Sequence, residues 1–171
     1  VNAAGNFEWL KQSRSLPGTG HAYGQAVSVD AQGNILMTGY FDSIIQFGTT
    51  TLTVASMFIY SEGFLVKYDS AGNVFWARQT HTQGNGFAKS FAITSNLSSD
   101  AIITGVYMSP AMFGTHTLPD NGMEVFVALY DSTGTCQWAR ASVGQNPGAF
   151  GYGVSTDNKG SYYVTGFDKA P

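Results

Sequence analysis

The sequence predicts an all-β fold made of one unit repeated in tandem, and three observations lead to it: composition, recurring motifs and turn patterns. Charged residues make up only 11% of the 171 residues, about half the usual share, while the chain holds 21 glycines. Few charges and many turn-forming residues suit short strands joined by tight turns better than helices. The apolar share of 43% is too high for a disordered chain.

Four motifs recur along the chain in the same order, so this is a repeat protein. The clearest marker is a tryptophan, since Trp9, Trp76 and Trp138 stand 67 and 62 residues apart in similar surroundings. The matching segments are 5–11, 72–78 and 134–140 around the tryptophans; 35–39, 101–105 and 162–166; 47–52 and 113–118; and 68–72 and 130–134.

The pattern within a unit predicts short strands. Residues 26–30 alternate between apolar and polar, with Val27 and Val29 on one face, and the matching residues of the next unit alternate in the same way. Three further segments are rich in β-branched or aromatic residues and are bounded by turn residues: 35–41, 64–68 and 73–79. Because no segment has a convincing helical period, each unit is expected to hold four strands.

An Asp-x-x-Gly pattern marks the hairpins between these strands. The aspartate caps a type I turn through its carboxylate, and the glycine supplies the left-handed residue that closes the hairpin. The pattern occurs at 30–33, 69–72, 131–134 and 157–160. The segment from Ser95 to Asp100 departs from it, and we expect a hairpin tip that is two residues longer there.

Four antiparallel strands joined by hairpins are typical of a propeller blade. The expected fold is therefore all-β, a partial β-propeller with about two complete four-stranded blades plus two partial ones. Residues 1–171 form one propeller segment, with units at 1–14 (partial), 15–80, 81–142 and 143–171 (partial). Since a closed ring needs at least about four blades, we expect an open, curved array or self-association through open blade edges.

Several motifs together resemble a known family. They are Asp-x-x-Gly-Asn at 30–34, Thr-Gly-Tyr-Phe at 38–41, Phe-Gly-Thr-x-Thr-Leu at 47–52 and the run from Phe64 to Ala77. In this succession the chain is similar to the bacterial seven-bladed β-propeller repeat family, from about residue 5 to residue 167. The resemblance implies a propeller within a large secreted or cell-surface bacterial protein, often beside adhesion-type domains. It implies no agreed enzymatic activity and supplies no catalytic residues.

The single cysteine is expected to be structural. Cys136 stands where Val74 and Phe7 stand in the sister units, which predicts a buried, unreactive thiol. One cysteine also excludes an internal disulfide.

No metal and no cofactor are expected. His116 matches Thr50 of the first unit, and neither His21 nor His81 has the spacing of a metal ligand. Each Asp-x-x-Gly turn offers one carboxylate, which is too few for calcium.

Three glutamates, Glu8, Glu62 and Glu124, are conceivable acid catalysts. However, Glu62 and Glu124 are equivalent in the repeat, which favours one structural role carried out twice. A simple register across the Asp-x-x-Gly turns places Glu62 near Arg78 and Glu124 near Arg140, as cross-strand charge pairs. The tryptophans could stack on sugars, but their recurrence inside a strand of each unit favours a core position between blades.

Charge and hydropathy argue against nucleic acid and the membrane interior as partners. A formal net charge of -3 and a pI near 5.4 provide no basic stripe for nucleic acid. No apolar run approaches the roughly 18 residues of a spanning helix, so membrane insertion is not expected. The chain begins without Met or a signal peptide, as expected of a mature or excised segment.

One loop stands out as a candidate binding site. The segment between the Phe-Gly-Thr motif and the next strand is four residues longer in the first unit than in the second, and the surplus at 55–61 is strongly apolar. Either these side chains fold back over a blade edge, or Met57, Phe58 and Tyr60 form an exposed contact patch.

The function expected from these features is a non-enzymatic binding or scaffold module of a secreted or surface-attached bacterial protein. Its location would be extracellular or at the cell surface, and its partner an unknown protein, an adjacent domain or a glycan. One alternative is a fragment of a propeller enzyme, a glycan lyase or hydrolase whose catalytic residues lie in blades not present here. A second alternative is a structural spacer.

Overall fold

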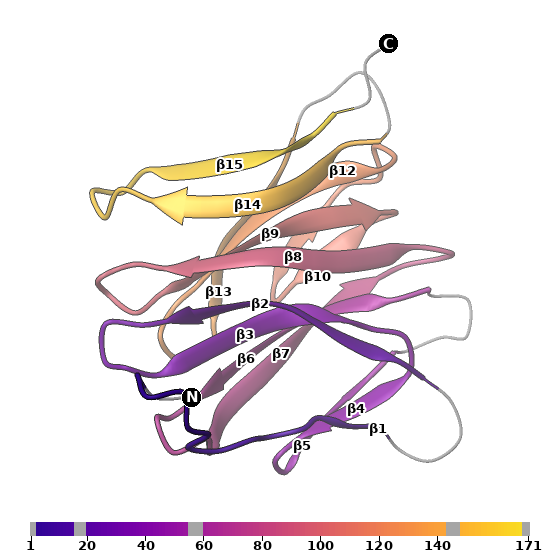
Figure 1. Ribbon diagram of the computed structural model, residues 1–171. Coiled ribbons are helices and arrows are strands. Elements are labelled where there is room, and N and C mark those ends of the chain that lie inside the picture. The colour runs from indigo at the N-terminus through magenta and orange to yellow at the C-terminus, as the bar shows by residue number, and fades with distance from the viewer. Residues whose placement is uncertain (1–2, 16–19, 55–59, 143–147, 169–171) are drawn as a thin grey trace.

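The computed structural model describes residues 3–15, 20–54, 60–142 and 148–168, and these residues contain strands but no helix (Figure 1). The first complete unit comprises β2 (Ala22–Val29), β3 (Ile35–Phe41), β6 (Glu62–Tyr68) and β7 (Val74–Thr82). The second comprises β8 (Phe87–Ser95), β9 (Ala101–Met108), β12 (Glu124–Tyr130) and β13 (Cys136–Ala141). A third begins with β14 (Phe150–Thr156) and β15 (Tyr162–Phe167). Within each unit the strands pair antiparallel in sequence order, which confirms the all-β, partial-propeller fold class.

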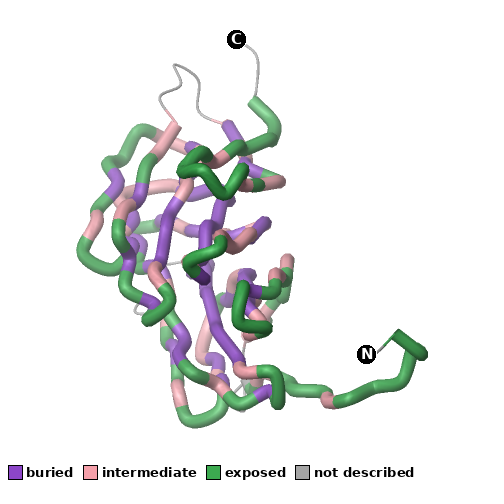
Figure 2. The backbone as a smooth tube through the Cα atoms, turned by 90° about the vertical axis from the view of Figure 1, so that its left-hand side faces the viewer, coloured by how far each residue is buried: buried purple, intermediate pink, exposed green. Residues whose placement is uncertain are grey.

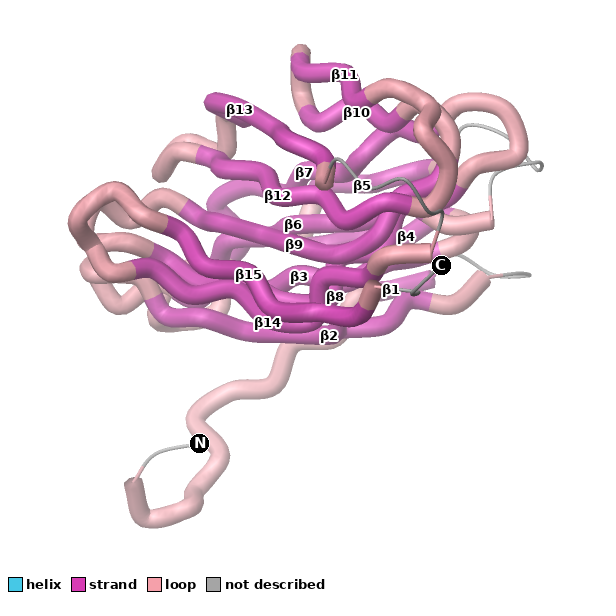
Figure 3. Tube along the Cα trace, turned by 90° about the horizontal axis from the view of Figure 1, so that it is seen from above, coloured by secondary structure: helices cyan, strands magenta, loops and turns pink. Residues whose placement is uncertain are grey.

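The sheets stack with their first strands close together. β8 packs against β2 on one side and β14 on the other. Seen from above, these first strands lie at one edge of the stack, which we call the inner edge, and β13 lies at the opposite, outer edge (Figure 3).

The Phe-Gly-Thr motif forms a hairpin that joins each unit to the segment before it, where the sequence predicts only a loop. In the second unit, β10 (Ala111–Phe113) and β11 (His116–Leu118) extend the sheet of the first unit, because β10 pairs with β7. The first unit does the same with β4 (Ile44–Phe47) and β5 (Thr50–Thr53), since β4 pairs with β1 (Arg14–Ser15). Each hairpin thereby covers the unpaired outer edge of the preceding segment.

The buried core runs along the stack and between the units (Figure 2). Its main cluster combines residues of the first and second units, including Leu65, Trp76, Ile103 and Cys136. Trp76 is only 9% exposed and Cys136 only 7%. Both core predictions are therefore confirmed, and the sugar-stacking role is wrong for Trp76.

Trp76 holds the first complete unit against the second by binding an Asp-x-x-Gly turn. Its indole Nε1–H donates to the carbonyl oxygen of Ser132 at 3.1 Å. A Cβ atom on Gly134 would lie 2.7 Å from Cδ2 of the ring, so only glycine fits beneath it. Arg78 adds two bonds to the same turn, from Nε to the Gly134 carbonyl at 2.8 Å and from Nη2 to the Thr133 carbonyl at 3.3 Å. We call this arrangement the tryptophan clamp.

The same clamp recurs one unit earlier. Trp9 Nε1–H donates to the carbonyl oxygen of Ser70 at 2.9 Å. A Cβ atom on Gly72 would lie 3.0 Å from the Trp9 ring and 2.9 Å from Cε of Lys11, which takes the place of Arg78. Both junctions therefore share an indole N–H donor, a turn carbonyl that accepts from it, and a glycine against the ring.

The hairpin turns confirm the role predicted for aspartate, and one of them corrects a prediction. Asp69 Oδ1 accepts hydrogen bonds from the N–H groups of Ala71 and Asn73, as expected of a capping carboxylate. The longer tip expected at 95–100 is wrong, because β8 ends at Ser95 and β9 begins at Ala101, which equals the spacing between β2 and β3. Ser99 adopts a left-handed φ of 63° at the position where Gly33 of the sister hairpin adopts 79°.

The predicted glutamate–arginine pairs are also wrong. In the β6–β7 ladder Arg78 lies opposite Leu65, while Glu62 lies opposite Phe41 of β3. The turn takes in residues 69–73, and a bulge between Val74 and Trp76 shifts the register further than a simple count allows.

Candidate functional site

A row of aromatic side chains crosses the inner edge of three units. We call it the aromatic belt, and its members are Tyr23, Tyr40, Phe91, Tyr152, Phe150 and Phe167. Along this order the centroids of successive rings are 4.8, 6.2, 5.6, 5.9 and 6.2 Å apart. These spacings are those of interacting aromatic pairs, so the belt is continuous.

The local backbone explains how the belt forms. Each first strand carries a β-bulge at the same position, and the extra residues are Gln25 in β2, Phe91 in β8 and Tyr152 in β14. A bulge re-aims its side chain, and here it brings Phe91 between Tyr40 of one neighbouring unit and Tyr152 of the other. Because Gln25 occupies the same position in the first unit, the fold does not require an aromatic residue there.

Much of the belt faces solvent. Tyr23, Tyr152 and Phe167 are 44%, 55% and 53% exposed, and the remaining members are half-buried. A contiguous exposed aromatic surface on paired strands is a typical contact surface for a ligand or a second protein.

One cation lies within the belt. Lys89 Nζ is 4.8 Å from the ring centroid of Tyr40 and 5.5 Å from that of Phe87. In the described ranges the ion pairs are His21–Asp42 and Lys67–Asp30, so Lys89 has no carboxylate partner there. The belt thus combines ring faces and edges with one uncompensated positive charge, which suits a ligand with flat apolar faces and an anionic group.

The contact patch predicted in the loop is only partly described. Met57 and Phe58 lie outside the described residues. Tyr60 is 69% exposed, and its backbone N–H donates to the Gly86 carbonyl at 3.1 Å. The patch of Met57, Phe58 and Tyr60 stays a prediction.

The two equivalent glutamates have the structural role expected of them. Glu62 is fully buried and accepts hydrogen bonds from Thr80 Oγ1 at 2.6 Å and from the Thr82 N–H at 2.8 Å. Glu124 is likewise buried and accepts from the hydroxyl of Ser142. Burial raises the pKa of Glu62, although the bonds from Thr80 and Thr82 oppose that rise.

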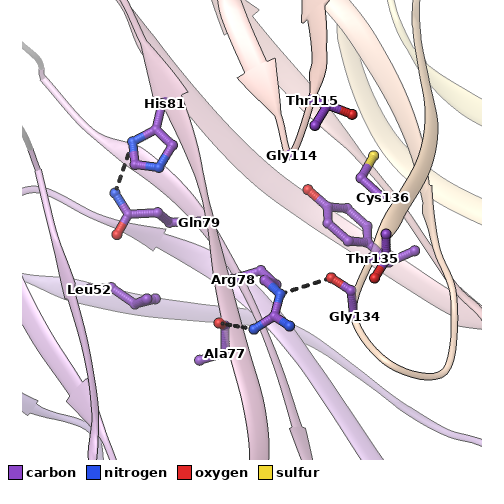
Figure 4. Close-up of a pocket in the computed structure, with 11 residues that line it drawn as sticks. Leu52, Ala77, Arg78, Gln79, His81, Gly114, Thr115, Gly134, Thr135 and Cys136 are labelled. Carbon is purple, nitrogen blue, oxygen red and sulfur yellow. Dashed lines mark hydrogen bonds between the residues drawn. The ribbon is translucent and has the colours of Figure 1, made fainter.

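A hollow of about 480 Å³ lies beside the tryptophan clamp, between β7 and the turn that follows β12 (Figure 4). Arg78 crosses it to the Gly134 carbonyl, and Gln79 Nε2 lies 3.4 Å from His81 Nδ1. Burial raises the pKa of the Cys136 thiol to about 11, so the thiol is protonated at neutral pH and is not an activated nucleophile. The polar groups of this hollow therefore support the junction between units.

Within the described part of the chain, no three His, Cys, Asp or Glu side chains converge in a way that could hold a metal ion. In the same residues no helix is long and apolar enough to cross a membrane.

Comparison with known proteins adds a distant similarity. No family model matches the chain. An uncharacterised WD repeat-containing protein of Acanthamoeba polyphaga mimivirus is 24% identical over an alignment of 139 residues, and the match covers 74% of this chain but only 10% of that protein. WD repeats form propeller blades, in agreement with the sheets described above. The resemblance to the bacterial seven-bladed family stays a prediction, and the chain is a propeller-like all-β repeat array with weak similarity to a WD repeat protein.

Proposed function

We propose that this chain is a non-enzymatic, propeller-like binding module of a secreted or surface-attached bacterial protein, and that the aromatic belt is its contact surface. The observation that carries the proposal is the continuity of the belt across three stacked units. The rings project from paired strands, so they are held in place before a ligand arrives and little conformational entropy is lost on binding.

The ionisable groups of the central strands support binding rather than catalysis. Glu62 and Glu124 are engaged by hydroxyl and backbone donors inside the sheets, where no substrate reaches them. Lys67 and Asp30 are committed to each other at 2.8 Å. By contrast, the belt offers exposed rings and a free ammonium group.

The partner classes that fit are a glycan, a protein or an adjacent domain. Aromatic rings stack on the C–H faces of sugars and on apolar side chains alike, while tyrosine hydroxyls donate and accept hydrogen bonds. The extracellular or cell-surface location rests on the resemblance to the bacterial propeller repeats.

The proposal is tested with an array of neutral and acidic oligosaccharides, followed by calorimetry on the best ligand. The variant Phe91→Gln/Tyr152→Gln places at both bulges the residue that the first unit already carries, so the fold is retained. We expect it to weaken binding by roughly tenfold or more. The matched control is Tyr163→Ser, which removes an aromatic residue that is 61% exposed and lies outside the belt. Unchanged binding by the double variant, or turnover of a sugar by the wild-type chain, would contradict the proposal.

A further inference from the structure

One position of the aromatic belt changes from aromatic to cationic in the middle unit. In each unit this residue lies on the first strand, opposite the residue that follows the glycine of the second strand. The residues at this position are Tyr23, Lys89 and Phe150, in the order of the units. A cation therefore stands between two aromatic residues, and the belt carries its positive charge near its centre.

The ammonium group of Lys89 is held in place but not consumed by the protein. Its Nζ lies 4.8 Å from the ring centroid of Tyr40 and 5.5 Å from that of Phe87, and the side chain is half-buried. Among the described residues it forms neither a hydrogen bond nor an ion pair. Because contact with ring faces leaves the N–H groups unbonded, Lys89 keeps its donors for an anionic group of a ligand.

The charges near the two ends of the belt are negative. At one end the His21 ring stacks on Tyr23 with centroids 6.0 Å apart, and Asp42 Oδ2 lies 3.2 Å from His21 Nδ1. At the other end the exposed Asp168 directly follows Phe167. A ligand with many negative charges would meet these carboxylates, whereas one anionic group placed at Lys89 would not. The charge pattern therefore favours a ligand with a single anionic group and uncharged flanks.

The uncharged flanks match a sugar chain. Successive ring centroids of the belt are 4.8 to 6.2 Å apart, which is comparable with the length of one pyranose residue. The tyrosines among these residues have hydroxyl groups, and the bulge of the first unit has the amide of the exposed Gln25. Sugars offer C–H faces to rings and hydroxyl groups to such polar atoms, so one ligand satisfies both.

We propose that the aromatic belt binds a linear glycan with one uronic acid, and that Lys89 binds the carboxylate of that uronic acid. This inference rests on the proposed function, because it takes the belt as the contact surface. The rings contact the neutral sugars, while the ammonium group donates a charge-assisted hydrogen bond to the carboxylate. Lys89 is thus the residue that determines specificity, since a neutral glycan of the same backbone would leave its charge without a partner.

The test compares three β-1,4-linked hexasaccharides by calorimetry on the full chain. They are cellohexaose, the same hexamer with one internal glucuronic acid, and a hexamer of glucuronic acid alone. The hexamer with one carboxylate is expected to bind about tenfold more tightly than cellohexaose, and more tightly than the fully acidic hexamer. This preference over cellohexaose should largely disappear at about 1 M salt, where charges are screened within a few ångströms.

Three variants assign the preference to Lys89. Lys89→Met keeps an apolar stem on the rings but removes the charge, so the ratio of the two affinities should fall to about one. Lys89→Arg keeps the charge and should keep the preference. The matched control is Lys159→Met, which removes an equal charge at the exposed turn between β14 and β15, outside the belt, and should leave the preference unchanged.

Equal affinities for cellohexaose and the hexamer with one carboxylate, or no binding of either, would overturn this inference. A preference that persists in Lys89→Met, or tightest binding of the fully acidic hexamer, would overturn it as well. If Lys89→Met does not fold, the salt dependence of the wild-type preference decides. The proposed function is judged separately: if Phe91→Gln/Tyr152→Gln weakens binding of both hexamers equally, the belt is the contact surface even where the carboxylate is not recognised.

Discussion

The two complete units share one backbone register but use different chemistry at their first hairpin. In the first unit Asp30 pairs with Lys67 at 2.8 Å, and both side chains are buried. In the second unit Asn96 replaces the aspartate and Leu129 replaces the lysine, so neither charge is present. The hairpins are nevertheless the same length and close with the same backbone bonds, as Asp30 N–H to Asn34 O and Asn96 N–H to Asp100 O.

The amide and the carboxylate within the hairpin also change places. Asn34 Nδ2 donates to Asp30 Oδ2 at 3.0 Å in the first unit, whereas Asn96 Nδ2 donates to Asp100 Oδ2 at 2.9 Å in the second. The bond survives because donor and acceptor are exchanged together. The buried aspartate and its lysine are therefore replaced together, since a single buried charge without its partner is costly, while the carboxylate that the second hairpin keeps, Asp100, is only half-buried.

The largest expected effect concerns Trp76 and its equivalent in the next unit, Trp138. Trp76→Ala should lower the free energy of unfolding by about 3–5 kcal/mol, because the ring is buried between units. Trp138→Ala should cost less, about 1–2 kcal/mol, since this ring is only half-buried. Urea unfolding followed by circular dichroism measures both. Equal losses would show that the two rings do not differ in burial in solution.

The next prediction concerns the buried ion pair of Asp30 and Lys67. Lys67→Leu introduces the residue of the second unit and should cost about 3 kcal/mol, because Asp30 is left buried without its cation. Adding Asp30→Asn removes the buried charge that Lys67→Leu leaves unpaired and should restore most of that loss, which a double-mutant cycle in urea measures as coupling. A double variant as unstable as Lys67→Leu alone would mean that the two sites are not interchangeable.

Alanine substitutions at two glycines distinguish the cost of a left-handed backbone from the cost of steric crowding. Gly33 and Gly134 have nearly the same φ, 79° and 80°, so alanine at either position costs about 1 kcal/mol for the left-handed backbone. A Cβ on Gly33 meets nothing within 4 Å, whereas one on Gly134 meets the Trp76 ring. Gly134→Ala should therefore cost about 2–3 kcal/mol in all, by thermal unfolding. Equal losses at the two positions would contradict the close contact at the clamp.

The smallest expected effect is on how far the Tm falls at low pH. Burial alone would raise the pKa of Asp30, but the bonds from Lys67, Asn34 and Gln32 outweigh it and lower the pKa. A lowered folded-state pKa gives stability that is present above the ordinary pKa of aspartate and is lost as the pH falls through the folded value.

The double variant Asp30→Asn/Lys67→Leu should accordingly lose less Tm than the wild type between about pH 5 and about pH 2. The pKa values of the exposed turn aspartates Asp69, Asp131 and Asp157 are also lowered, and their contribution cancels in this comparison. Glu62 acts in the opposite sense, because its raised pKa makes its contribution largest at low pH. Parallel acid profiles in calorimetry would show that the Asp30–Lys67 pair does not govern this sensitivity.

Features that repeat could be predicted from the sequence, and features that differ between units could not. Comparing sister units identified the core positions of Trp76 and Cys136 and the shared role of Glu62 and Glu124. The same comparison gives no sign of the aromatic belt, because its residues differ between units. Lys89 stands at the position of Tyr23, and Gln25 stands at the position of Phe91. The glutamate–arginine pairs failed for another reason, since a simple count allows neither for the turn at 69–73 nor for the bulge between Val74 and Trp76.

The sequence by itself determined the strands, the Asp-x-x-Gly turns and their order, because these depend on local backbone preferences and on alternation along a few residues. Only the tertiary structure decided which strands meet across units: β10 on β7, Trp76 on the turn at 131–134, and Phe91 between Tyr40 and Tyr152. Those contacts join residues 29 to 61 positions apart. They depend on how one sheet stacks on the next, which burial and close packing select and which no local pattern of residues specifies.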